Sequence, residues 1–139
     1  MEIGREIVFV SHLLKRNVDR ITVKHGLSVN QSHILMYLHD HGGTAYQKDL
    51  EEVVHLRRSS ITVHLQKLEK GGLIERENVD AKQKCLVLTE EGELKVKEIQ
   101  QIFVESERRL AEIMQDDGDK LVELLVKLKE VLIKEENDV

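Results

Sequence analysis

The sequence contains no proline, a single cysteine and very few aromatic residues. Without proline, and with 34% charged residues, the chain favours long helices that expose solvated faces. Because aromatic residues make up only 3% of the chain, its core must be aliphatic, built from Leu, Val and Ile. Cys85 has no second cysteine to pair with, which excludes an intramolecular disulfide.

Long apolar runs are also missing. No stretch approaches the roughly 18 consecutive apolar residues that a membrane-spanning helix needs. The N-terminal segment carries Glu2 and Glu6 and has no cleavage site of small residues, so we expect no signal peptide. A chain of 139 residues suits one ordinary domain, and we expect a soluble cytoplasmic protein with no membrane partner.

The sequence lacks the groupings that enzyme chemistry requires. It shows no nucleophile–base pairing, no phosphate-binding glycine loop and no complete set of metal ligands. The chain has seven histidines, but a zinc site needs three or four converging ligands, and His39 and His41 do not face each other on a helix. We therefore expect no enzyme activity, no cofactor and no metal site.

Apolar residues at three- and four-residue steps predict a helix over 3–24, ended by Gly26. Ser28 and Gln31 then have the spacing of a capping box, which predicts a second helix that stops at Gly42-Gly43. A short third helix follows at 47–54.

The next segment, "RRSSITVHLQKLEKGGLI" at 57–74, predicts a fourth, amphipathic helix ended by Gly71-Gly72. One face of this helix is mainly apolar, and it consists of Ile61, His64, Leu65 and Leu68. The opposite face is mainly polar, and it consists of Ser59, Val63, Gln66, Lys67 and Lys70.

Beyond this helix the periodicity changes. "LIEREN" at 73–78 and "KCLVLT" at 84–89 alternate, which predicts two strands of a β-hairpin. Thr89 then caps a long helix over about 90–115, "DDGD" at 116–119 interrupts it, and a last helix follows.

The charge of the chain is segregated. The whole chain has a formal net charge of −5, but residues 57–84 contain seven basic and four acidic side chains, a net charge of +3. A short helix, a tight connection and a helix with a polar and basic face form a helix-turn-helix, and the hairpin makes it winged. Such a helix fits the DNA major groove, where its side chains reach base edges.

The outer helices exceed what a small winged-helix core requires, and each is apolar along one face. We therefore expect a homodimer, which places two recognition helices about 34–36 Å apart on a pseudo-palindromic site.

Three segments carry a family resemblance: "NQSHILMYL" at 30–38, "RRSSITVHLQKLEKGGLIER" at 58–76 and "LVLTEEG" at 86–92. The chain resembles the MarR-type transcriptional regulators over nearly its whole length. The resemblance implies a mainly α fold with a small β wing, as a single domain over 1–139. In it the DNA-binding lobe spans 28–89, and dimerisation helices span 1–26 and 90–139. It also implies repression of nearby genes, often relieved by a small phenolic or other apolar ligand.

The sequence departs from the family at the wing. The hairpin "ENVDAKQKC" is shorter, Ala81 stands where the family has its first arginine, and Lys82 stands at the second. Because lysine is a point charge rather than a planar fork, this predicts a weaker, mostly electrostatic wing contact. Val63 also occupies a position where polar residues are common, and it either contacts a thymine methyl or contributes nothing.

The residues predicted to contact DNA lie on the fourth helix and the wing. For each the competing interpretation is an ordinary solvated surface, or local capping in the case of the hydroxyls. The predicted set is Arg57, Arg58, Ser59, Ser60, Thr62, Val63, Gln66, Lys67, Arg76, Lys82 and Lys84.

An effector pocket is expected between the dimer helices and the DNA-binding lobe, with His12, His33, Met36 and Tyr37 as candidate lining residues. The alternative is that these four simply pack the junction of the first two helices. His33 matches a zinc ligand of the family's zinc-responsive branch, but residues 90–118 lack that branch's other histidines. A metal-responsive regulator, or a winged-helix module that binds protein rather than DNA, remains as an alternative.

Overall fold

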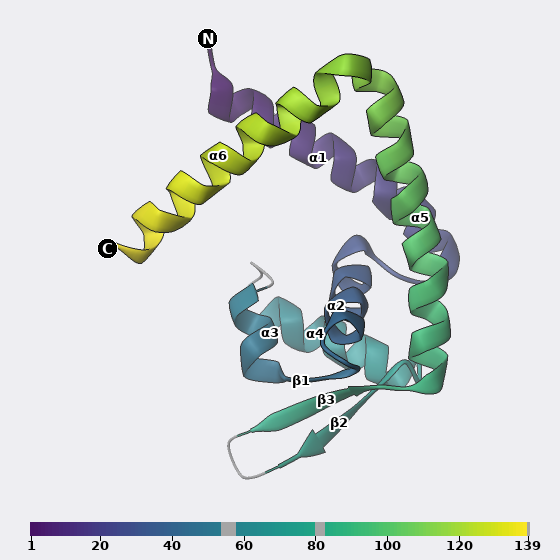
Figure 1. The fold of residues 1–139 in the computed structure, drawn as a ribbon. Helices are drawn as coiled ribbons and strands as arrows, with labels where there is room; N and C mark the ends of the chain where they lie inside the picture. The colour runs from purple at the N-terminus through teal and green to yellow at the C-terminus, as the bar shows by residue number, and fades with distance from the viewer. Residues whose placement is uncertain (54–57, 80–82, 139) are drawn as a thin grey trace. The chain divides into compact units, whose positions relative to one another are not determined.

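The structure is a computed structural model that describes residues 1–53, 58–79 and 83–138. The chain divides into two compact units, Met1–Phe103 and Val104–Val139. The described elements appear in Figure 1 and are, in chain order, α1 (Ile3–Thr22), the 3₁₀ turn η1 (Val23–His25), α2 (Val29–Asp40), β1 (Thr44–Tyr46), α3 (Gln47–Val53), α4 (Arg58–Lys70), β2 (Ile74–Asn78), β3 (Lys84–Leu88), α5 (Glu90–Met114), the 3₁₀ turn η2 (Gln115–Asp117) and α6 (Gly118–Asn137).

The helix boundaries in the first unit follow the local signals in the sequence. Gly26 ends the first helical segment in the left-handed region, at φ 80°, a conformation that glycine adopts without strain. The Ser28 hydroxyl then accepts from the backbone N–H of Gln31, and the Gln31 side chain accepts from the backbone N–H of Ser28. The predicted capping box at the start of α2 is therefore confirmed.

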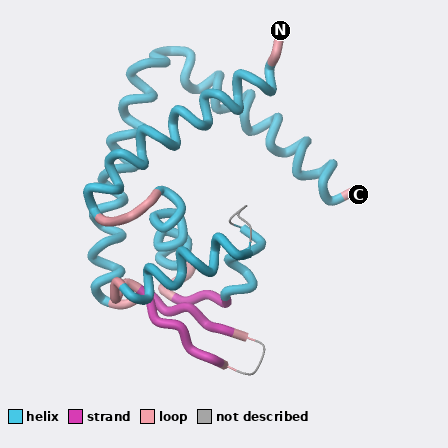
Figure 2. The backbone as a smooth tube through the Cα atoms, turned by 180° about the vertical axis from the view of Figure 1, so that it is seen from behind, coloured by secondary structure: helices cyan, strands magenta, loops and turns pink. Residues whose placement is uncertain are grey.

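The sheet has one strand more than the sequence predicted. The hairpin of β2 and β3 is present, pairing Ile74 with Leu88 at one end and Asn78 with Lys84 at the other. β1 pairs antiparallel with the other edge of β3, which gives the strand order β1-β3-β2 (Figure 2). β1 spans three residues, too few for alternation to be visible, and it exists because β3 offers it a partner.

The core of the first unit is aliphatic, as the composition predicted. Its largest fully buried side chains come from α2, α3, α4, the wing strands and the first half of α5. They include Ile34, Leu35, Leu38, Leu50, Ile61, Leu65, Leu68, Ile74, Leu86, Val96 and Ile99.

A hydrogen-bonded junction joins the end of α4, the end of the wing and the start of α5. The Thr89 hydroxyl donates to the Gly72 carbonyl at 2.7 Å and accepts from the Gly92 N–H at 3.0 Å, as a helix cap. A Cβ at Gly92 would lie 2.2 Å from the Leu73 carbonyl oxygen. Only glycine allows this approach, which fixes the start of α5 against the exit of α4.

The second unit contains the end of α5, η2 and α6. The interruption predicted at 116–119 is present, because α5 ends at Met114 and α6 begins at Gly118. None of the α6 side chains is buried, and Leu121, Leu124, Leu125, Leu128 and Leu132 are all exposed. Within the described residues, no helix has the length and apolar character needed to cross a membrane.

Candidate nucleic-acid interface

α4 is held in place by three apolar side chains on one face. Ile61, Leu65 and Leu68 are at most 1% exposed, and they belong to the core cluster that α2 also enters. Residues spaced by three and four positions lie on one side of a helix, so burying these three turns the opposite side outward. The predicted division of α4 into an apolar and a polar face is therefore confirmed.

The outward face of α4 is polar and basic around one apolar side chain. Ser59, Val63, Gln66 and Lys67 are exposed, while Ser60 and Thr62 are half-buried at its edges. Arg57 and Lys82 lie outside the described residues, and so does the side chain of Arg58. The described part of α4 thus presents hydroxyl, amide and ammonium groups, which suit phosphate oxygens and base edges.

His64 and Gln31 connect α4 to the start of α2. Because Oε1 of Gln31 accepts from Ser28, its Nε2 is the group that faces His64 Nδ1, at 3.4 Å. Partial burial lowers the pKa of His64, and the charges of Lys67 and Lys15 lower it further. A neutral ring can accept the amide hydrogen, so His64 serves the contact between the two helices.

Arg76 on β2 forms an ion pair within the lobe. Its Nε and Nη2 donate to Glu69 Oε1 at 3.3 and 3.1 Å, which ties the wing to the last turn of α4. This hydrogen bond is the main reason that the pKa of Glu69 is lowered. The guanidinium predicted to contact DNA is thus already paired, whereas Lys84 on β3 has an exposed side chain.

The four candidate effector residues do not gather in one place. His12 lines a cleft of about 510 Å³ together with residues of α1, of the start of α2 and with His64. His33 instead stacks on Phe103, with ring centroids 5.6 Å apart. Met36 and Tyr37 pack against the hydrophobic core.

Three further residues of α1 line this cleft and were not among the predicted site residues. Lys15, Arg16 and Asp19 line it with His12, and the spacing of these four residues puts them on one side of the helix. That spacing was the signal available in the sequence. Val29 and the cationic side chains of Lys15 and Arg16 line the cleft, and the Asp19 carboxylate beside them accepts from the Val29 N–H, so the lining suits a small ligand with an apolar body and a polar or anionic group.

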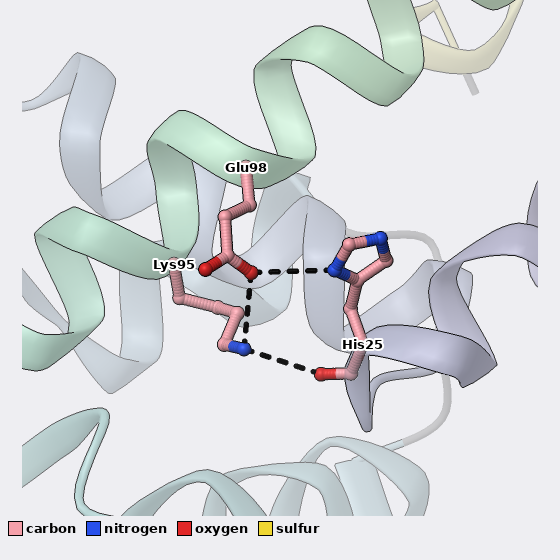
Figure 3. Close-up of polar contacts among 3 residues, drawn as sticks. All are labelled: His25, Lys95 and Glu98. Atoms are coloured by element: carbon pink, nitrogen blue, oxygen red, sulfur yellow. Dashed lines mark hydrogen bonds and ion pairs between the residues drawn. The ribbon is translucent and has the colours of Figure 1, made fainter.

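Two histidines contact glutamates of α5 inside the first unit. Figure 3 shows Glu98 between His25 and Lys95, with Oε2 at 3.3 Å from His25 Nδ1 and at 3.2 Å from Lys95 Nζ. These contacts, Lys95 first, lower the pKa of Glu98. His39 Nδ1 lies 2.9 Å from Glu93 Oε2 in the same way. In the part of the chain that the structure describes, no group of three or more histidine, cysteine, aspartate or glutamate side chains could hold a metal ion.

The sequence profile of the MarR family matches residues 25–84, which hold α2 to the start of β3. No curated protein sequence matches the chain. Among solved structures, the Staphylococcus aureus MepR–DNA complex is 25% identical, with a TM-score of 0.83, over 93% of this chain and 96% of that chain. AbsC, a MarR family transcriptional regulator from Streptomyces coelicolor, is also 25% identical, with a TM-score of 0.83, over 97% and 93%.

A third structure shares the fold. The organohalide-sensing regulator RdhR, in its 2,4-dichlorophenol-bound form, is 21% identical, with a TM-score of 0.79, over 92% of this chain and 78% of that chain. A helix with one buried face and one outward polar face, followed by a β-hairpin in a three-stranded sheet, defines a DNA-binding protein of the winged helix-turn-helix class. The chain is therefore similar to the MarR family of transcriptional regulators, in sequence over residues 25–84 and in fold over most of its length.

Proposed function

We propose that the protein is a repressor that binds a pseudo-palindromic operator as a homodimer through the outward face of α4. The observation that carries this proposal is the outward face itself. Exposed Ser59, Gln66 and Lys67 lie on a helix whose other side is fully buried. The similarity to a regulator solved as a DNA complex supports the same docking.

Exposed apolar side chains support the homodimer. α6 exposes five leucines, of which Leu124 is 51% and Leu132 is 53% exposed. α1 exposes Ile3, Ile7 and Val10 at similar levels. Exposed apolar side chains in such number on a single helix are characteristic of interfaces, and a two-fold dimer is the commonest way to cover them.

An effector is assigned to the cleft at His12, Lys15 and Arg16, next to His64 of α4. A ligand there regulates DNA binding only if it binds the free and the DNA-bound conformations with different affinity. RdhR, with the same fold, was solved with 2,4-dichlorophenol, an ionisable phenol. A ligand of that kind has an apolar body for Val29 and a polar oxygen for the cationic side chains.

The test is a titration of the full-length protein with a duplex from its own promoter region, at several salt concentrations. We expect a complex whose affinity falls steeply with salt, because each neutralised phosphate releases counterions. Lys67→Glu should abolish the complex, whereas Lys97→Glu, the same change at an exposed position of α5, should retain it. Absence of a complex at low salt contradicts the proposal.

The acidic net charge of −5 favours a second candidate, a winged-helix module that binds another protein. The Lys67→Glu variant separates the two functions. If the protein is a protein-binding module, the Lys67→Glu variant still binds its protein partner. The wild-type protein then forms no specific complex with DNA.

A further inference from the structure

Val63 is the apolar exception on the outward face of α4. Its side chain is 48% exposed, whereas Ile61, Leu65 and Leu68 on the other side of the helix are buried. The fold does not explain a valine here, since the residue is not part of the core cluster. Valine is also a poorer helix former than alanine, so local helix stability does not favour it either.

The position of Val63 is central on that face. Ser59 lies one turn before it, and Gln66 and Lys67 lie one turn after it, and all three side chains are exposed. The polar groups therefore surround the valine along the helix. If the polar face enters a groove of DNA, the two methyl groups of Val63 enter with it.

The major groove offers one apolar group, the 5-methyl group of thymine. We infer that Val63 is a specificity-determining residue of this regulator, and that it contacts a thymine 5-methyl group in each half of the operator. This inference rests on the proposed function, because it requires α4 to lie in the major groove. An isolated exposed valine is also common on protein surfaces. The experiment therefore has to distinguish a valine that contacts the thymine methyl group from one that makes no contact with DNA.

Replacing thymine by uracil removes the methyl group and leaves the base-pair hydrogen bonds unchanged. Duplexes are first selected from a random-sequence library with the full-length wild-type protein. Each thymine of the selected duplex is then replaced by deoxyuridine, one position at a time, and the affinity is measured. For the contacted thymine we expect about a fourfold loss of affinity, the value of one buried methyl group.

The same series is measured with Val63→Ala. This variant keeps a good helix former at an exposed position, and far-ultraviolet circular dichroism verifies its helix content. Its affinity should be lower on the thymine duplex and unchanged by the uracil that weakens wild type. Leu94→Ala, which truncates an exposed apolar side chain on α5, should respond to uracil as wild type does.

The outcomes separate the two proposals. If wild type selects a sequence but no uracil weakens it, or if the same uracil weakens Val63→Ala equally, the inference is wrong and the proposed function stands. If wild type selects no sequence, both fail together. A uracil effect that Val63→Ala abolishes supports the inference.

Discussion

At the scale of single residues, contact distances decide which positions tolerate change. Gly92 approaches the Leu73 carbonyl so closely that a methyl group has no room there. A Cβ atom at Gly92 would also lie 2.6 Å from Leu88 Cδ1. Gly4, in the first turn of α1, has no atom within 4 Å of the corresponding position. Two glycines of one chain therefore carry opposite predictions.

Gly92→Ala should lower the free energy of unfolding by about 1–3 kcal/mol, the usual cost of forcing an extra methyl group into a packed site. Urea denaturation of wild type and variant measures it. Gly4→Ala should leave the stability unchanged or raise it slightly, since it only restricts the unfolded chain. Equal stability of Gly92→Ala and wild type would show that α5 can shift away from Leu73.

The stability of the chain should also depend on pH through His33. Partial burial of the ring, and then the charge of Lys15, lower its pKa below the ordinary value of 6.5. The unfolded chain therefore takes up the proton more readily than the folded chain. The contribution of His33 to the free energy of unfolding is fully present above about pH 6.5. It is lost as the pH falls through the lower pKa that His33 has in the folded state.

Thermal unfolding between pH 7.5 and pH 5 tests this sign. Wild type should lose stability on acidification, and His33→Gln should lose less, because glutamine does not titrate. The pKa of His64 is also lowered in the folded state. A variant with both His33→Gln and His64→Gln should therefore show the smallest dependence of stability on pH. A wild-type protein that gains stability toward pH 5 would contradict the prediction.

At the scale of elements, periodicity and caps predicted α2, α4 and the β2–β3 hairpin, because their signals are local. Ser28 and Gln31 lie three residues apart, and the apolar face of α4 repeats within a few turns. β1 was missed because its three residues depend on pairing with β3, about forty residues further along the chain.

The candidate site was likewise predictable only where its signals are local in the sequence. The outward face of α4 follows from its apolar face, so Ser59, Gln66 and Lys67 were correctly predicted to be exposed. The pairing of Arg76 with Glu69 joins two elements, and no spacing rule indicates it. The helical spacing of His12, Lys15 and Arg16 indicates that they share one side of α1, but the cleft itself forms only where α1, α2 and α4 come together, and no spacing within α1 indicates that.

The wing therefore carries a prediction about two basic residues. Lys84 is exposed, and Lys84→Gln should make the fall of log affinity with log salt concentration less steep. The change in slope should correspond to the loss of about one phosphate contact per half-site. Arg76 is engaged by Glu69, so Arg76→Gln should change that dependence less and should lower stability by about 0.2–1 kcal/mol. Salt titrations of both variants, with urea denaturation, measure the difference. A larger salt effect from Arg76→Gln would assign the DNA contact to the arginine.

At the scale of the whole molecule, the exposed leucines of α6 predict association. Leu121, Leu125 and Leu128 lie on one side of the helix, and Lys127 lies toward the other side. Leu125→Gln with Leu128→Gln should shift a dimer toward monomer and weaken operator binding at least tenfold, since a monomer holds one half-site. Sedimentation equilibrium and DNA titration measure the two effects.

Lys127→Gln is the matched control, a change to the same residue type in the same helix. It should leave both the dimer and the DNA affinity as in wild type. A leucine variant that remains dimeric would place the interface away from this side of α6.

The Thr89 hydroxyl, introduced above as a helix cap, has a mechanical consequence. One oxygen atom bonds both Gly72, where α4 has just ended, and Gly92, where α5 begins, while the Thr89 N–H donates to Leu73. The end of α4, the base of the wing and the start of α5 are thus tied together through one residue. If α4 docks on DNA as proposed, a displacement of α4 would also displace the base of the wing, so the two elements would move as one body.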